Sequence, residues 1–231
     1  GLPTFYFLVT TYGEQLVTDR RSQLQAHASA AATVLSENLN ERRREVELLA
    51  QTPLYVTQPL DHPGIRAGLD RIQRSYPNYS WIGVTSTDGI VKAATRGHLV
   101  GIDVSSRPWF SKARDGLYIG DLHEAVLLSK LLPAEGTDAL RFIDFSTPIY
   151  DRSGNPKGIL GAHVHWRWAR EVLTAVIPES TQAHGVEFLI IDRNGKTIYP
   201  ERLQSGPAAP TLEAVKAKRS SDFHAWGDGG E

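Results

Sequence analysis

Two stretches of alternating sequence place one acid and two imidazoles among apolar side chains. Asp144 lies within residues 141–150, and His163 and His165 lie within residues 158–166. Because successive side chains of a strand point to opposite faces, a strand at each place would put these groups on a largely apolar face. A polar group buried there costs free energy unless it is paired. The partner is another of these side chains, the backbone or a ligand, and alternation alone leaves the three open.

A second cluster of functional side chains lies in the segment Arg107-Pro108-Trp109-Phe110. The planar guanidinium of arginine is suited to a carboxylate, and two aromatic rings can wall a small pocket. Trp109 would equally fit an ordinary core. The candidate ligand-binding residues are therefore Arg107, Trp109, Phe110, Tyr118, Asp121, His123, Asp144 and His163.

The same acid and imidazoles raise the alternative of an enzyme. His123, His163 and His165 would form a metal site or an acid–base cluster with Asp144 if the fold brought them together. The chain contains neither a His-Glu-x-x-His motif nor a nucleophile elbow. The sequence therefore favours a binding site over a catalytic one, and it predicts no metal and no cofactor.

Composition limits the class of protein further. The 231 residues carry 25 basic and 26 acidic side chains, so the formal net charge of -1 offers no cationic field to nucleic acid. The absence of cysteine excludes disulfides, thiolate nucleophiles and Cys-based metal sites. Hydrophobic residues make up 41%, which is enough for a folded core arranged as one large fold or two small modules.

A long helix is predicted at the start of the chain. Residues 14–51 contain no proline or glycine, and apolar residues recur there at steps of three, four or seven. Residues 2–9 are apolar but fall short of the roughly 20 that a membrane span needs, so they are interpreted as the trimmed end of a membrane helix or as residual tag sequence. Three prolines between 53 and 63 then make a loop, and a short helix follows at 65–72.

Three hairpins are predicted by Asp-Gly or Asp-x-x-Gly turns. They join strands 79–86 with 90–95, 141–150 with 158–166, and 187–191 with 196–199. Between the first two hairpins, a short helix at 105–115 precedes a strand from Tyr118; Ser106 is its expected cap and Pro108 lies in its first turn. The first two hairpins and the strand from Tyr118 give five antiparallel strands with helices inserted after the second, which describes an α+β fold with the long helix available for one face of the sheet.

Four segments in a fixed order carry a family resemblance. They are DVSSRPWF at 103–110, GLYIGD at 116–121, PIYDRSG at 148–154 and GILG at 158–161. In this order, after a long leading helix, they resemble the double Cache family of extracytoplasmic sensor domains over nearly the whole chain. The resemblance implies an α+β fold in which two PAS-like antiparallel-sheet modules stack on a long N-terminal helix.

The resemblance also implies a division of the chain. Residues 1–51 would be the N-terminal end of a membrane span and a signalling helix, 52–177 the membrane-distal ligand-binding module, and 178–231 an incomplete membrane-proximal module. A connecting helix is expected at 167–177 and another helix at 212–217.

Such domains are implied to be non-enzymatic, periplasmic parts of histidine kinases, chemoreceptors or diguanylate cyclases, held between two membrane spans that this chain lacks. A small anionic or zwitterionic ligand would bias the long helix, which would also be the surface of a homodimer. The alternative is a sensor-like module that recognises a protein partner and no small ligand. The five tryptophans do not decide between the two, because they are more typical of core and pocket wall than of interface anchors.

Amino-acid-binding members of the family hold the ligand carboxylate and wall the pocket with Arg, Trp and a further aromatic residue. The resemblance assigns these roles to Arg107, Trp109 and Phe110, with Phe in place of the usual Tyr. The family's Asp that holds the ligand ammonium is matched here by His163, and an imidazole is no counter-ion for ammonium. An α-amino acid would then need Asp144 or Asp121 instead, whereas a small organic acid without an amine would not.

Overall fold

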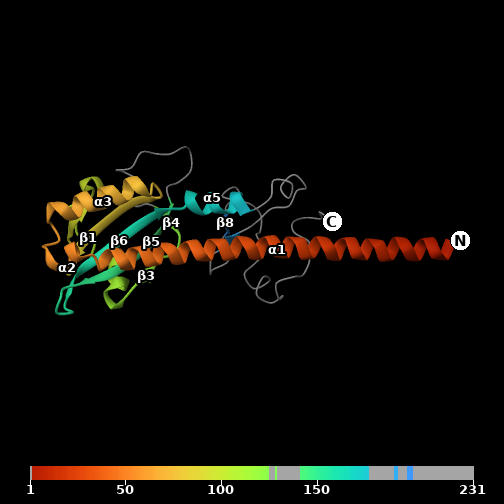
Figure 1. Ribbon diagram of the computed structural model, residues 1–231, viewed down its shortest axis with the longest axis horizontal. Coiled ribbons are helices and arrows are strands. Elements are labelled where there is room, and N and C mark those ends of the chain that lie inside the picture. The colour runs from red at the N-terminus through yellow and green to blue at the C-terminus, as the bar shows by residue number, and fades with distance from the viewer. Residues whose placement is uncertain (1, 125–127, 129–140, 177–189, 192–196, 200–231) are drawn as a thin grey trace. The chain divides into compact units, whose positions relative to one another are not determined.

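The chain is described here by a computed structural model that covers residues 2–124, 128, 141–176, 190–191 and 197–199 (Figure 1). Contacts within the chain form two compact units. One unit is residues 37–170, and the other combines residues 1–36 with residues 171–231. The helix predicted at 212–217 lies outside the described residues.

Three helices precede the first strand. Helix α1 (Leu2–Ala50) begins well before residue 14, because Pro3 lies in its first turn, where proline is tolerated, and Gly13 costs little in so long a helix. Helices α2 (Pro53–Thr57) and α3 (Pro63–Ser75) each begin at a proline, so the stretch predicted as a loop contains one short helix. Among the described residues, no helix is long and apolar enough to cross a membrane.

An antiparallel sheet of six strands forms the centre of the unit 37–170 (Figure 1). Its strands are β1 (Tyr79–Ser86), β2 (Val91–Ala94), β3 (Tyr118–Ile119), β4 (His123–Glu124), β5 (Arg141–Tyr150) and β6 (Pro156–His165). They lie in the order β2-β1-β6-β5-β3, and the short β4 also pairs with β5. The predicted α+β class and the first two hairpins are confirmed.

The second unit contributes three described elements. They are the start of α1, most of α5 (Arg167–Val176), and the two-stranded antiparallel sheet of β7 (Ile190–Ile191) and β8 (Thr197–Tyr199). The connecting helix and the third hairpin that the sequence predicts are therefore present.

The register of β5 and β6 is fixed by a turn built on one carboxylate. Asp151 Oδ1 accepts hydrogen bonds from the backbone N–H groups of Ser153 and Asn155, at 2.8 and 2.9 Å. Gly154 adopts φ 82° in this turn, a left-handed conformation that glycine reaches without strain. The turn places Asp144 directly opposite His163 and Ser146 opposite Gly161.

Helix α4 (Pro108–Lys112), followed by a 3₁₀ turn at Ala113–Asp115, corrects one prediction. Its N-cap is Arg107, not Ser106, and no side chain caps it. The preceding turn is closed by Asp103 Oδ1, which accepts from the Ser105 N–H at 2.8 Å, and by the bond from Arg107 N–H to the Val104 carbonyl. That turn includes Ser106, so the cap lies one residue later than predicted, and the helix begins at Pro108 rather than at residue 105.

A bulge in β1 places Tyr79 and Trp81 on opposite faces of the sheet, although they are two residues apart. Tyr79 pairs with Val164 and Trp81 pairs with His163, with an irregularity between them. The Gln73 amide of α3 holds this bulge, because its Nε2 donates to the carbonyls of Tyr79 and Ser80 at 3.0 and 2.9 Å. Trp81 thus shares the face of His163, and Tyr79 lies on the opposite face.

Tyr79 connects the sheet to the last turns of α1. Its hydroxyl donates to Glu45 Oε2 at 2.7 Å, and the same carboxylate oxygen pairs with Arg42 Nη1 at 2.9 Å. Burial, and then the bond to Glu45, raise the pKa of Tyr79 well above its ordinary value, so the phenol stays a neutral donor.

The substitution Tyr79→Phe is expected to lower the free energy of unfolding by about 1–2 kcal/mol, since it removes a hydrogen bond to a charged acceptor. Tyr76→Phe is the matched control, because Tyr76 lies edge-on to Tyr79 but is exposed. Urea unfolding of both variants measures the difference. Equal stability of the two variants would show that the Tyr79–Glu45 bond contributes nothing.

A second prediction concerns the turn between β5 and β6. The hydrogen bond from the Asn155 backbone N–H lowers the pKa of Asp151, so its stabilising contribution is full above the unfolded-state pKa, about 4, and is lost as pH falls through the lower folded value. Asp151→Ala should lower Tm at about pH 7, and the gap to the wild type should close toward about pH 3. Asp61→Ala, at an exposed acid, should leave Tm unchanged throughout. A gap independent of pH would contradict the assignment.

Candidate functional site

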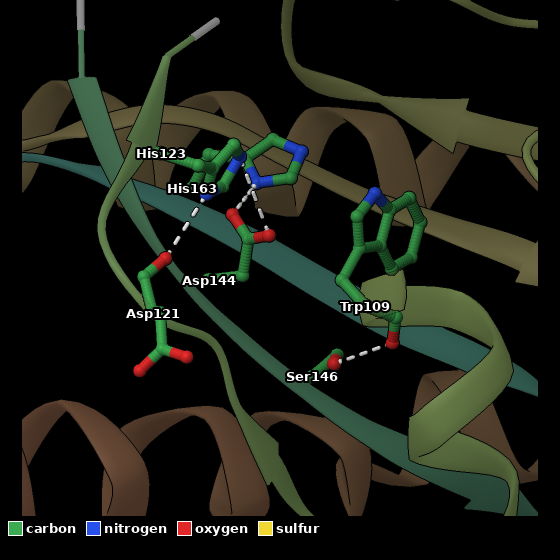
Figure 2. Close-up of polar contacts among 6 residues, drawn as sticks. All are labelled: Trp109, Asp121, His123, Asp144, Ser146 and His163. Atoms are coloured by element: carbon green, nitrogen blue, oxygen red, sulfur yellow. Dashed lines mark hydrogen bonds and ion pairs between the residues drawn. The ribbon is translucent and has the colours of Figure 1, made fainter. Parts of the chain in front are cut away.

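A buried acid–imidazole pair lies at the centre of one face of the sheet. Asp144 of β5 and His163 of β6 are only 6% and 7% exposed, and their Oδ1 and Nδ1 atoms are 2.5 Å apart (Figure 2). The bond follows from the register, which sets the two residues directly opposite each other. A carboxylate oxygen accepts, so Nδ1 of His163 carries the hydrogen.

His123 is a second imidazole beside the Asp144 carboxylate. It lies on β4 opposite Phe142, and its Nε2 is 3.5 Å from Asp144 Oδ2, while its Nδ1 is 3.1 Å from the Asp121 carbonyl oxygen. The side chain of His123 is 42% exposed, in contrast to the buried pair. Among the described residues, Asp144 therefore has two ion-pair partners, and both are imidazoles.

The imidazole of His163 lies inside a box of aromatic rings. Trp81 and Phe142 stack on it at centroid distances of 5.0 and 5.8 Å, each inclined by 26°. They come from β1 and β5, which flank β6 on opposite sides, so the imidazole is held between them. Trp109 meets it edge-on at 5.6 Å and 83°. We refer to Trp81, Trp109 and Phe142 as the aromatic box.

Helix α4 brings Trp109 to the sheet through two contacts. The Trp109 backbone carbonyl accepts from the buried Ser146 hydroxyl at 2.7 Å (Figure 2). Its indole lies flat on Gly161, where a Cβ would come within 2.6 Å of ring atom Cζ3. A residue larger than glycine at 161 would therefore displace the indole from the His163 ring.

The structure brings together four of the residues predicted from the sequence, Trp109, His123, Asp144 and His163. Phe110 is buried in the core behind them, edge-on to Trp109. Tyr118 pairs across from Ser146 in the sheet and packs on the edge of that core, with Lys112 Nζ 5.2 Å from its ring centroid. Asp121 contributes the carbonyl that His123 binds.

Arg107 occupies a different position from that of the acid and imidazoles. It is half-buried at the N-terminus of α4, two residues before Trp109, and among the described residues its guanidinium has no ion-pair partner. The geometry thus connects it to the box through the backbone of α4.

The cluster predicted by the enzyme alternative does not form as a unit. His165 accepts a hydrogen bond at Nδ1 from the Arg167 N–H at 2.9 Å and meets Phe142 edge-on, whereas His123 and His163 lie beside Asp144. Among the described residues, no group of three or more His, Asp or Glu side chains is arranged to hold a metal ion.

Sequence reasoning missed the roles of Trp81, Phe142, Ser146 and Gly161. Phe142, Ser146 and Gly161 could have been found from the sequence. Extending the antiparallel register back from the turn at Asp151–Gly154 pairs position 142 with 165, 144 with 163 and 146 with 161. Trp81 depends on which strand lies beside β6, which the turn does not specify.

The contact between Gly161 and Trp109 gives a testable prediction. Gly161→Val should lower the free energy of unfolding by about 1–3 kcal/mol and change the tryptophan fluorescence, because the indole must leave the sheet. Gly68→Ala in α3 is the control, since its Cβ would meet no atom closer than 3.9 Å, and it should leave stability unchanged or slightly higher. A Gly161→Val protein as stable as the wild type would contradict the packing described.

Comparison with known proteins bears on the fold. No protein-family model matches the chain, and no curated protein sequence matches it either. Solved structures do match. The ligand-binding domain of the Pseudomonas aeruginosa amino acid chemoreceptor PctC, in complex with GABA, is similar with a TM-score of 0.61 and 18% identity over 85% of this chain and 82% of that chain.

Two further structures extend the comparison. The sensory domain of the Campylobacter jejuni chemoreceptor Tlp3, with isoleucine bound, has a TM-score of 0.67 and 14% identity over 88% of this chain and 81% of that one. The sensor domain of the Vibrio cholerae histidine kinase DctB has a TM-score of 0.55 and 10% identity over 68% of this chain and 60% of that one. At these identities the likeness establishes the fold alone, and it confirms the predicted α+β class with a long N-terminal helix.

Proposed function

We propose that this chain is the extracytoplasmic sensor part of a membrane signalling protein and that its module at 52–177 binds a small ligand carrying a carboxylate. The observation that carries the proposal is a buried acid–imidazole pair in an aromatic box, on a sheet with the fold of ligand-binding sensor domains. Aromatic walls around a few polar groups are typical of a small-molecule site, and Arg107 lies two residues before Trp109 of the aromatic box.

The charges of the site favour an anionic ligand group. Asp144 is the one buried acid among the described residues, and both of its oxygens face imidazoles. The Asp144 carboxylate is therefore already paired within the protein, and Arg107 is the proposed group that binds a ligand carboxylate through its planar guanidinium. GABA and isoleucine, found in the similar domains, both contain a carboxylate. A small organic acid fits this site better than an amino acid, whose ammonium would need a free carboxylate.

The proposed output runs through α1. Ligand binding shifts the balance between two arrangements of the module only if it binds one of them better, and the change then reaches the helix that the sheet contacts through Tyr79 and Glu45. The remaining parts of the proposal are the periplasmic location, the homodimer along α1, a membrane-proximal module from residue 178, and a kinase, chemoreceptor or cyclase as the parent protein. The module itself is proposed to have no enzymatic activity.

A thermal-shift screen against small carboxylates, amino acids and amines tests the function. At a ligand concentration ten times Kd, the wild type should gain about 3–6 °C in Tm with carboxylates. Arg107→Ala should lose this gain. Without ligand its Tm should equal that of the wild type, because the guanidinium of Arg107 carries no structural ion pair among the described residues.

Arg152→Ala, which removes an exposed guanidinium from the turn between β5 and β6, is the matched control and should respond as the wild type does. An equal response of Arg107→Ala and wild type would overturn the role of Arg107. No response of the wild type to any carboxylate or amino acid, together with self-association that depends on protein concentration, would favour a protein partner instead.

A further inference from the structure

The surroundings of His163 are those of a binding site for an organic cation. Aromatic faces attract cations through the negative potential above the ring, and a carboxylate at the same place adds a hydrogen-bond acceptor and a charge. The aromatic box and the Asp144 carboxylate supply both features around one imidazole ring. The protein's own side chain therefore occupies the position that a cationic ligand group would take (Figure 2).

We propose that His163 is a built-in occupant of a cation-binding site and that it sets the ligand specificity of the module by filling that site. Removal of the imidazole converts the box into a site for imidazole or a small alkylammonium ion. The inference rests on the proposed function for its biological meaning, because it explains how the module would exclude amines. Its chemistry can be tested without any ligand of the wild type.

Three features of the structure support this conversion. The His163 ring is almost completely buried and is contacted by rings from β1, β5 and α4, so the walls of the site come from three elements other than its own strand. Truncation at Cβ leaves a void of about the size and shape of imidazole, and apolar voids of this kind bind small molecules that fit them. It also leaves Asp144 Oδ1 without its donor, which is costly until a new donor enters.

The site also lies close to solvent. The His123 side chain is 42% exposed, and its Nε2 lies 3.5 Å from Asp144 Oδ2, so the carboxylate has a solvent-exposed neighbour. The proposed point of entry for a probe of imidazole size is therefore beside His123.

The experiment measures Tm and refolding yield of His163→Ala with and without imidazole and methylammonium. His163→Ser, whose hydroxyl can still donate to Asp144, is measured beside it in case the alanine variant folds poorly. At a probe concentration ten times Kd, both variants should gain about 3–6 °C, and the wild type should gain less than about 1 °C. Refolding that occurs only when imidazole is present is an equally positive result.

Two control variants test whether the response to the probes comes from the aromatic box and Asp144. His165→Ala removes an imidazole from the same face of the same strand, but its ring lies outside the box, so imidazole should give no gain. The double variant Asp144→Asn with His163→Ala keeps the void and loses the charge, so its response to methylammonium should fall at least about tenfold in apparent affinity.

Folded His163 variants that respond to neither probe would overturn the proposal, and so would variants that stay unfolded with imidazole present. These outcomes are separate from the carboxylate screen of the wild type. The wild type can fail to bind carboxylates while the variants still bind imidazole, which would refute the proposed function and leave the cation site standing.

Discussion

A carboxylate buried on the face of a sheet must be paired, and the pairing of Asp144 with His163 is the constraint on which the rest of this site depends. It requires the β5–β6 register, since a shift of one residue would move one partner to the other face. It requires rings rather than water around the imidazole, which Trp81, Trp109 and Phe142 provide. The position of α4 follows, because its tryptophan reaches the imidazole only where the sheet carries a glycine, at Gly161.

The bulge in β1 gives the pair a structural connection to α1. Trp81 stacks on His163 on one face, and two residues earlier Tyr79 donates to Glu45 of α1 on the other. A regular strand would have put both rings on the same face. Gln73 holds the two carbonyls that the bulge exposes. Proximity alone does not transmit a signal, which requires two arrangements that a ligand binds unequally. The contacts of Trp81 and Tyr79 connect the site to α1 through two neighbouring positions of β1, so a change in the site can reach the helix through this strand.

Much of the fold could be predicted from local sequence, because its signals are local. The turn at Asp151–Gly154 and the alternation beside it predicted β5 and β6 and the face that carries Asp144 and His163. What could not be predicted depends on tertiary neighbours. The choice of β1 as the strand beside β6 decides that Trp81 stacks on His163, and the two-residue strand β4 that carries His123 is too short to leave a pattern. The cap of α4 was misplaced because Asp103 closes the preceding turn.

The site depends on the His163 imidazole being a fixed hydrogen-bond donor to Asp144. The most direct measurement is ¹⁵N-edited NMR of the histidine rings in the wild type, with Asp144→Ala used for assignment. We expect a strongly deshielded, slowly exchanging Nδ1 proton on His163 that is absent from the variant. An unprotonated Nδ1 on His163, or a proton that exchanges as fast as those of an exposed histidine, would contradict it.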